Sequence, residues 1–197
     1  DTMAISYPMN TPTTIGIESI TLRAVNSVTT SQSPFTYKQQ VVDFGGQRWE
    51  ASASIPSVHR DKAAEWATML VALRGPVGTF LLGDPDYVTP RGDASSVVVT
   101  GSAGDSTVDV VMTGTLKAGD YIQLGSGSSA KLHKVLLDQT GNGNLEIWPA
   151  LRSDYTSATA TIDSPKGVFR LKQNMAEWSI NNASFYGISF EAVEVVT

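Results

Sequence analysis

The sequence contains no cysteine, and it has few charges and no long apolar runs. Without cysteine, neither disulfide bonds nor cysteine-ligated zinc can stabilise the 197-residue chain. No apolar run approaches the roughly 18 residues that a transmembrane helix needs, so no membrane partner is expected. The fold must therefore be held by a hydrophobic core and by contacts with partner proteins.

Charge is also scarce, because charged residues make up 17% of the chain and the net charge is −5. A protein that grips nucleic acid usually carries a basic patch, and no cluster of Lys and Arg is present. We therefore expect no specific nucleic-acid binding. A mildly acidic surface repels phosphate, which suits a passage through which DNA slides as cargo.

One stretch, residues 57–76, has a clear helical pattern. We expect Ser57 to cap its first turn and Gly75 with Pro76 to end it. Such a helix is stable only if its apolar face lies on another element, which in this chain must be a sheet. The apolar residues that recur at helical spacing are Ala63, Trp66, Leu70 and Leu73.

Most of the remaining chain alternates as strands do. Residues 3–14 are broken by Pro8 and Pro12, which predicts an extended arm. Gly45 and Gly46 predict a tight hairpin turn between two strands, and Gly187 is a candidate bulge. The expected strands around the helix cover residues 16–27, 36–44, 47–55, 79–82, 168–173, 177–181 and 185–196.

The middle of the chain is richer in Gly, Ser and Thr, and its strands are shorter. Five strands joined by turns predict a small barrel, with an OB-like barrel as the natural candidate. Because the first region has too few strands to close a sandwich alone, we assign the closing strands to it. The expected middle strands are residues 96–100, 107–112, 120–124, 131–137 and 144–148.

These patterns predict a mainly β protein of two domains. Residues 1–86 and 167–197 form a discontinuous β-sandwich belt domain with one α-helix. Residues 87–166 form an inserted OB-like barrel, which requires its two ends to lie close together.

Several short stretches together resemble the distal tail proteins of long-tailed bacteriophages, of the two-domain type with an inserted OB fold. The resemblance covers most of the chain and depends on the order and spacing of the stretches. They are Trp49 with Ile55-Pro56, Arg91-Gly92-Asp93 with Ser96-Val97, Lys117-Ala118-Gly119-Asp120, Lys134-Val135 with Ile147-Trp148-Pro149, and Tyr186-Gly187-Ile188-Ser189.

The resemblance implies a tail-tube-like belt domain and a structural role without enzymatic activity or cofactors. Six copies would form a homohexameric ring at the distal end of the tail, between the tail tube protein and the tip hub protein. The ring would leave a passage for DNA. The protein would be made in the cytoplasm of the bacterial host and located in the virion.

An inter-domain hinge is expected where the chain enters and leaves the middle segment. An Arg91–Asp93 contact is expected within it, and the tripeptide Arg91-Gly92-Asp93 is interpreted as a linker turn. The predicted hinge residues are Asp84, Pro85, Arg91, Asp93, Lys166 and Gly167.

The alternative function is a carbohydrate-binding module that acts through the inserted barrel in attachment to the host surface. Aromatic side chains on an OB-like barrel can stack on sugars, and the candidates are Tyr121, Trp148 and Tyr155. A third possibility, a hydrolase, lacks a nucleophile elbow. No catalytic, metal or cofactor site is predicted.

Ordinary structural roles account for the other residues that chemistry singles out. His59 and His133 lie far apart in the sequence, and a metal would need further ligands converging on them. The carboxylates of Asp84 and Asp86 flank Pro85, a pattern typical of a turn.

Overall fold

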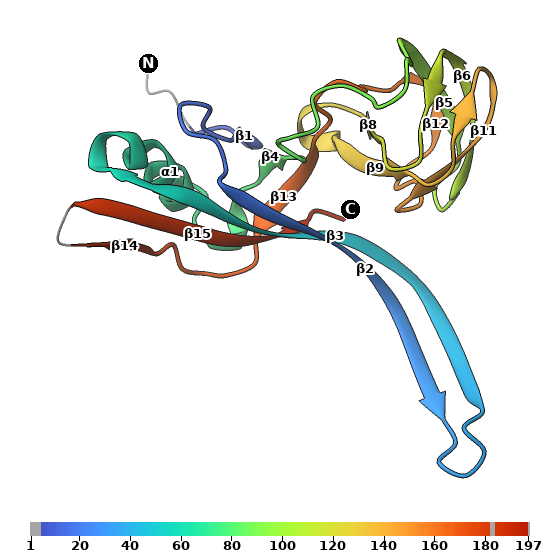
Figure 1. Ribbon diagram of the computed structural model, residues 1–197, viewed down its shortest axis with the longest axis horizontal. Coiled ribbons are helices and arrows are strands. Elements are labelled where there is room, and N and C mark those ends of the chain that lie inside the picture. The colour runs from blue at the N-terminus through green and yellow to red at the C-terminus, as the bar shows by residue number, and fades with distance from the viewer. Residues whose placement is uncertain (1–4, 182–183, 197) are drawn as a thin grey trace.

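The computed structural model describes residues 5–181 and 184–196 (Figure 1). The protein is mainly β, with one α-helix among the described residues and with curled sheets. The predicted fold class is confirmed. Within the described ranges, no helix is both long and apolar enough to cross a membrane.

The first sheet is built from both ends of the chain. In the described part of the chain it has seven strands. Six follow the order β1-β4-β13-β15-β3-β2, and the seventh, β14, pairs with the first residues of β15. Its strands are β1 (Met9–Asn10), β2 (Ser19–Gln32), β3 (Gln39–His59), β4 (Phe80–Leu82), β13 (Gly167–Leu171), β14 (Trp178–Ile180) and β15 (Phe185–Glu194).

Helix α1 (Arg60–Ala72) packs one face against this sheet, as its spacing predicts. Trp66 stacks on Phe190 of β15 with ring centroids 5.8 Å apart. The predicted cap by Ser57 is wrong, because β3 continues through His59 and the helix starts there without a side-chain cap. A short 3₁₀ turn, η1 (Gly75–Val77), follows the helix.

The predicted hairpin at Gly45-Gly46 is also wrong. Strand β3 runs through these glycines as a bulge, where Ser27 of β2 faces three residues of β3. Gly45 has a φ of +71° and donates its N–H to the Asp43 carboxylate at 2.8 Å. Paired glycines permit positive φ in a bulge as well as in a turn. The local sequence therefore did not distinguish a bulge from a hairpin turn. The real turn spans residues 33–38.

The second sheet contains the strands of the middle segment. Its described strands follow the order β12-β5-β6-β11-β9-β8. Gln123 of β8 forms a backbone bridge with Thr161, just after β12, and so closes the sheet on itself. The strands are β5 (Ser96–Gly101), β6 (Thr107–Thr113), β8 (Tyr121–Leu124), β9 (Lys131–Val135), β11 (Gly143–Trp148) and β12 (Tyr155–Thr159).

Five of these strands lie where the alternation predicts them, and β12 was missed. A separate pair, β7 (Thr115–Leu116) with β10 (Gln139–Thr140), and a 3₁₀ turn, η2 (Gly127–Ser129), complete the segment. The inward side chains form a continuous apolar core around Val99, Val110 and Leu145, each fully buried.

The predicted N-terminal arm is attached to its own chain over the described residues. Residues 3 and 4 lie outside them. Strand β1 pairs in parallel with β4, and the Tyr7 hydroxyl donates to the Ala72 carbonyl at 2.6 Å. At Gly187 the ladder between β15 and β3 shifts register, with the extra residue on β3.

The chain leaves the first sheet for the middle segment and returns to it at the same place. Leu82 at the end of β4 and Gly167 at the start of β13 are ladder partners. Strands on either side of the middle segment therefore belong to the first sheet. The division into a belt domain and an inserted OB-like domain stays a prediction.

Candidate interaction surfaces

Strands β2 and β3 extend beyond the first sheet as a two-stranded ribbon, which Figure 1 shows projecting away from the rest of the molecule. We define the ribbon as residues 25–48. Strand β15 pairs with β3 only as far as Glu50, so beyond that point β2 is the only described strand that pairs with β3. An isolated two-stranded hairpin is marginally stable in water.

The ribbon exposes large apolar side chains on both strands and on its turn. Phe35 at the turn is 91% exposed, Tyr37 is 73% exposed and Phe44 is 67% exposed. Burying side chains of this size is strongly favourable, and monomeric proteins rarely leave them clustered in water. The other exposed apolar residues of the ribbon are Val28, Val41 and Val42.

The turn at the end of the ribbon is nevertheless well defined. The Ser33 N–H donates to the Lys38 carbonyl at 3.0 Å, and the Tyr37 N–H donates to the Ser33 carbonyl at 2.9 Å. The Ser33 hydroxyl accepts further bonds from the N–H groups of Phe35 and Thr36, both at 3.4 Å. These bonds hold Phe35 at the outermost point of the ribbon.

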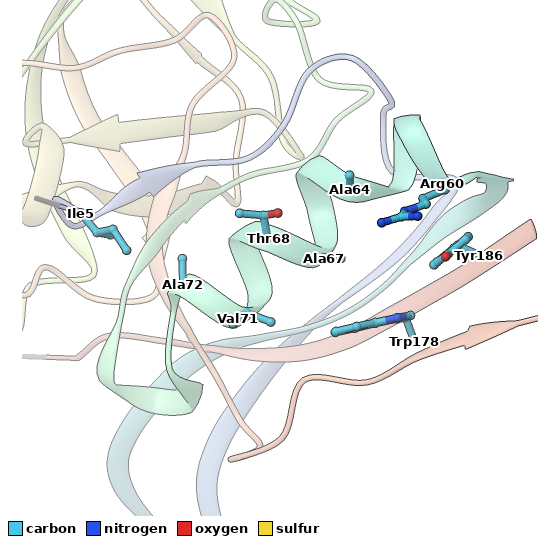
Figure 2. A pocket seen from close by; sticks show the side chains of 9 residues that line it. All are labelled: Ile5, Arg60, Ala64, Ala67, Thr68, Val71, Ala72, Trp178 and Tyr186. Carbon is cyan, nitrogen blue, oxygen red and sulfur yellow. The ribbon is translucent and has the colours of Figure 1, made fainter. Parts of the chain in front are cut away.

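A second apolar surface lies on the outer face of α1. Figure 2 shows a groove between this helix and the side chains of Trp178 and Tyr186. Its volume is about 590 Å³. Small residues on the helix leave this space open, and Val71 beside them is 56% exposed. The lining residues are Ile5, Arg60, Ala64, Ala67, Thr68, Val71, Ala72, Trp178 and Tyr186.

The three predicted sugar-stacking residues do not form one exposed platform. Tyr121 is buried against Trp49, and Trp148 packs edge-on against the same Trp49 with ring centroids 4.7 Å apart. Tyr155 lies at the margin of the core of the second sheet, where burial raises the pKa of its phenol. Carbohydrate binding through these residues stays a prediction.

The predicted hinge residues Asp84 and Pro85 lie in a turn. The Asp84 carboxylate accepts the N–H of Asp86 at 3.0 Å, and the Asp84 carbonyl accepts the N–H of Tyr87 at 3.2 Å. Burial is the main cause that raises the pKa of Tyr87 to about 12. The pair Asp84 and Asp86 therefore has the turn role expected of it.

Lys166 and Gly167 lie beside this turn on the returning chain. The Lys166 N–H donates to the Gln123 side chain at 2.8 Å. A Cβ added to Gly83 would lie 2.2 Å from the Pro165 carbonyl oxygen, so the outgoing and returning backbones touch. Their role as a hinge stays a prediction.

Arg91 and Asp93 bind different groups instead of each other. The Arg91 guanidinium donates to the Ala118 carbonyl at 2.8 Å, and its backbone N–H donates to the Asp120 carboxylate at 2.8 Å. Asp93 accepts the N–H of Thr115 at 2.8 Å. All these partners belong to the middle segment, so both residues are attached to it.

Neither histidine is placed as a metal ligand. The His59 ring packs at a tilt against Phe185 with ring centroids 4.4 Å apart. His133 is fully buried, its Nδ1 lies 2.7 Å from the Pro149 carbonyl, and burial lowers its pKa to about 4. No group of three or more potential metal-binding side chains occurs in the part of the chain that the structure describes.

Neither the ribbon nor the groove was predicted from the sequence. The signal for the ribbon was available, because Phe35 and Tyr37 are aromatic residues inside a polar turn. No local signal marks the groove, since its lining comes from four separate parts of the chain: the N-terminal arm, α1, β14 and β15.

No protein-family model matches the sequence, and no curated protein sequence matches it either.

Proposed function

We propose that the protein is a structural component that assembles with copies of itself into a homohexameric ring at the distal end of a long phage tail. The ring joins the tail tube protein to the tip hub protein and leaves a passage for DNA. The ribbon is the observation that carries self-assembly. The location in a phage tail depends on the resemblance of the sequence stretches given above.

The size of the exposed surface supports assembly. The three aromatic side chains of the ribbon together leave about 500 Å² in water, on the basis of about 200 Å² for each when fully exposed. A specific interface buries about 800 Å² on each partner. The ribbon therefore supplies more than half of the area that one stable contact needs.

The groove on α1 is the surface that we assign to receive the ribbon of the next copy. The two surfaces differ, and α1 lies at the opposite end of the first sheet from the projecting ribbon (Figure 1). A contact between two different patches is heterologous, and it generates a ring when the repeated rotation closes on itself. Each copy then offers one ribbon and one groove, so each ribbon and each groove inside the ring is covered.

The absence of cysteine allows a direct test by disulfide cross-linking. A chain carrying both Phe35→Cys and Val71→Cys has one thiol on the ribbon and one beside the groove. Oxidation should join copies into a ladder that ends at six. Each single variant should give dimers at most.

The matched control carries Phe35→Cys with Leu137→Cys, because Leu137 is exposed on the middle segment. It should not form a ladder beyond dimers. Equal ladders in both double variants, or none in the first, would contradict the assignment of the groove. Antibody labelling of tailed particles in negative stain tests the location, and label away from the distal tip would exclude it.

A further inference from the structure

The middle segment forms hydrogen bonds with the base of the ribbon. We define the clamp segment as residues 148–152, the end of β11 and the loop after it. The Trp148 indole N–H donates to the Asn26 side chain at 2.9 Å. The N–H of Ala150 donates to the Gln47 side chain at 2.8 Å, and Arg152 donates to the Gln47 carbonyl at 2.6 Å.

These contacts fall where the ribbon changes direction. Asn26 and Gln47 are ladder partners, and the register shifts immediately beyond them at the bulge. A bulge bends and twists its strand, and the bend can vary unless something fixes it. Gly46 keeps the bulge tight, because an added Cβ would lie 2.9 Å from the Cβ of Ser27.

The clamp segment is itself held from both sheets. Arg152 forms an ion pair with Glu194 of β15 at 3.0 Å, and their side chains are only 11% and 1% exposed. The same carboxylate accepts the backbone N–H of Trp49 at 3.0 Å. His133 on β9 holds the Pro149 carbonyl. Few of these groups can move without breaking a buried polar contact, which is costly.

We infer that the clamp segment sets the direction of the ribbon, so that the middle segment is a positioning element for the ribbon and its contact. The geometry of the monomer carries this inference. Its consequence for assembly rests on the proposed function. Trp148 and Arg152 are positioning residues, because they contact the ribbon base and not the exposed surface at its end.

The variant Asn26→Ala/Gln47→Ala removes the two side-chain acceptors from the ribbon and leaves the clamp segment intact. Spin labels at Tyr37→Cys and Val111→Cys, both exposed positions on the ribbon and on β6, report the angle between ribbon and second sheet. We expect a narrow distance distribution in the parent and one at least twice as wide in the variant, measured at dilution where the chain is monomeric.

The control is Thr107→Val, which removes a side-chain hydrogen bond to Glu146 inside the second sheet. It should leave the distribution unchanged. Trp148→Phe keeps an aromatic ring against Trp49 but loses the hydrogen bond to Asn26. If the double variant unfolds, the width of the distance distribution is measured in Trp148→Phe instead. An unchanged width in both Asn26→Ala/Gln47→Ala and Trp148→Phe would overturn the inference.

The cross-linking ladder separates this inference from the proposed function. Adding Asn26→Ala/Gln47→Ala to the Phe35→Cys/Val71→Cys chain should shorten the ladder by several steps. A ladder that still reaches six, together with a widened distribution, would overturn the link between clamp and assembly. If the Phe35→Cys/Val71→Cys chain forms no ladder even without the added substitutions, the ring is contradicted while the distance result stays valid.

Discussion

The ribbon and the second sheet contain similar sequences but bury them differently. In β6 every second side chain is buried, and Val108, Val110 and Met112 face the closed core. In the ribbon, Val41, Val42 and Phe44 are all exposed. The pattern of a strand therefore does not decide whether its apolar residues are buried. Whether these residues are buried depends on which other elements pack against each face of the strand.

The second sheet therefore forms a core of its own, whereas the ribbon has no core in the described structure. The second sheet closes through the Gln123–Thr161 bridge and encloses an apolar core of its own. In the described structure the two strands of the ribbon pair only with each other, and no second sheet covers them. Substitutions should therefore affect folding in the packed regions and association in the ribbon.

The largest effect is expected in the packed part, at Trp66. This side chain is 1% exposed, and its indole donates to the Ile15 carbonyl at 2.9 Å. Trp66→Ala should reduce the free energy of unfolding by about 3–5 kcal/mol, because it leaves a large cavity. Urea unfolding measures this. Val71→Ala on the outer face of the helix is the control, and an equal loss there would contradict the assigned faces.

A smaller effect is expected from the pH dependence of His133. The unfolded chain takes up a proton near the ordinary pKa of 6.5, whereas the folded chain does so near 4. Stability due to this group is therefore complete above pH 6.5 and falls between pH 6.5 and 4, by about 3 kcal/mol in total. His133→Gln should lose this part of the pH dependence in urea unfolding. His59→Gln should keep it, and the opposite ranking would refute the burial argument.

The smallest effect is expected in the ribbon, at Gly45. Its φ of +71° is unfavourable for other residues, although an added Cβ would meet nothing within 4 Å. Gly45→Ala should cost about 1 kcal/mol and speed amide exchange in the ribbon about fivefold. Gly16→Ala, which has open space and no positive φ, should change nothing. Faster exchange throughout the molecule would show that the ribbon is not a separate unit.

Alternation and helical spacing predicted most of the elements. The face of α1 with Trp66 and Leu70 is buried, and Trp49 and Ile55 share the inner face of β3 as expected. Local signals failed where one residue type serves two geometries, as at Gly45. Strand β12 was missed because its residues 155–159 are mostly polar, and Ser57 was misassigned because strand pairing extends to the start of the helix.

The contacts of the clamp segment could not be predicted from the sequence. Arg152 and Glu194 are 42 positions apart, and Trp148 and Asn26 are 122 apart. No periodicity or turn signal relates residues at such separations. Trp148 was considered as a sugar contact or a core residue, and the structure places it between the two sheets.

The pairing of Leu82 with Gly167 has a consequence for how such chains can change. Because Leu82 and Gly167 stand opposite each other in one ladder, a change in the length of the chain between them need not shift the register of β4 against β13. Insertions and deletions between these two residues are therefore expected to leave the pairing of β4 with β13 in place.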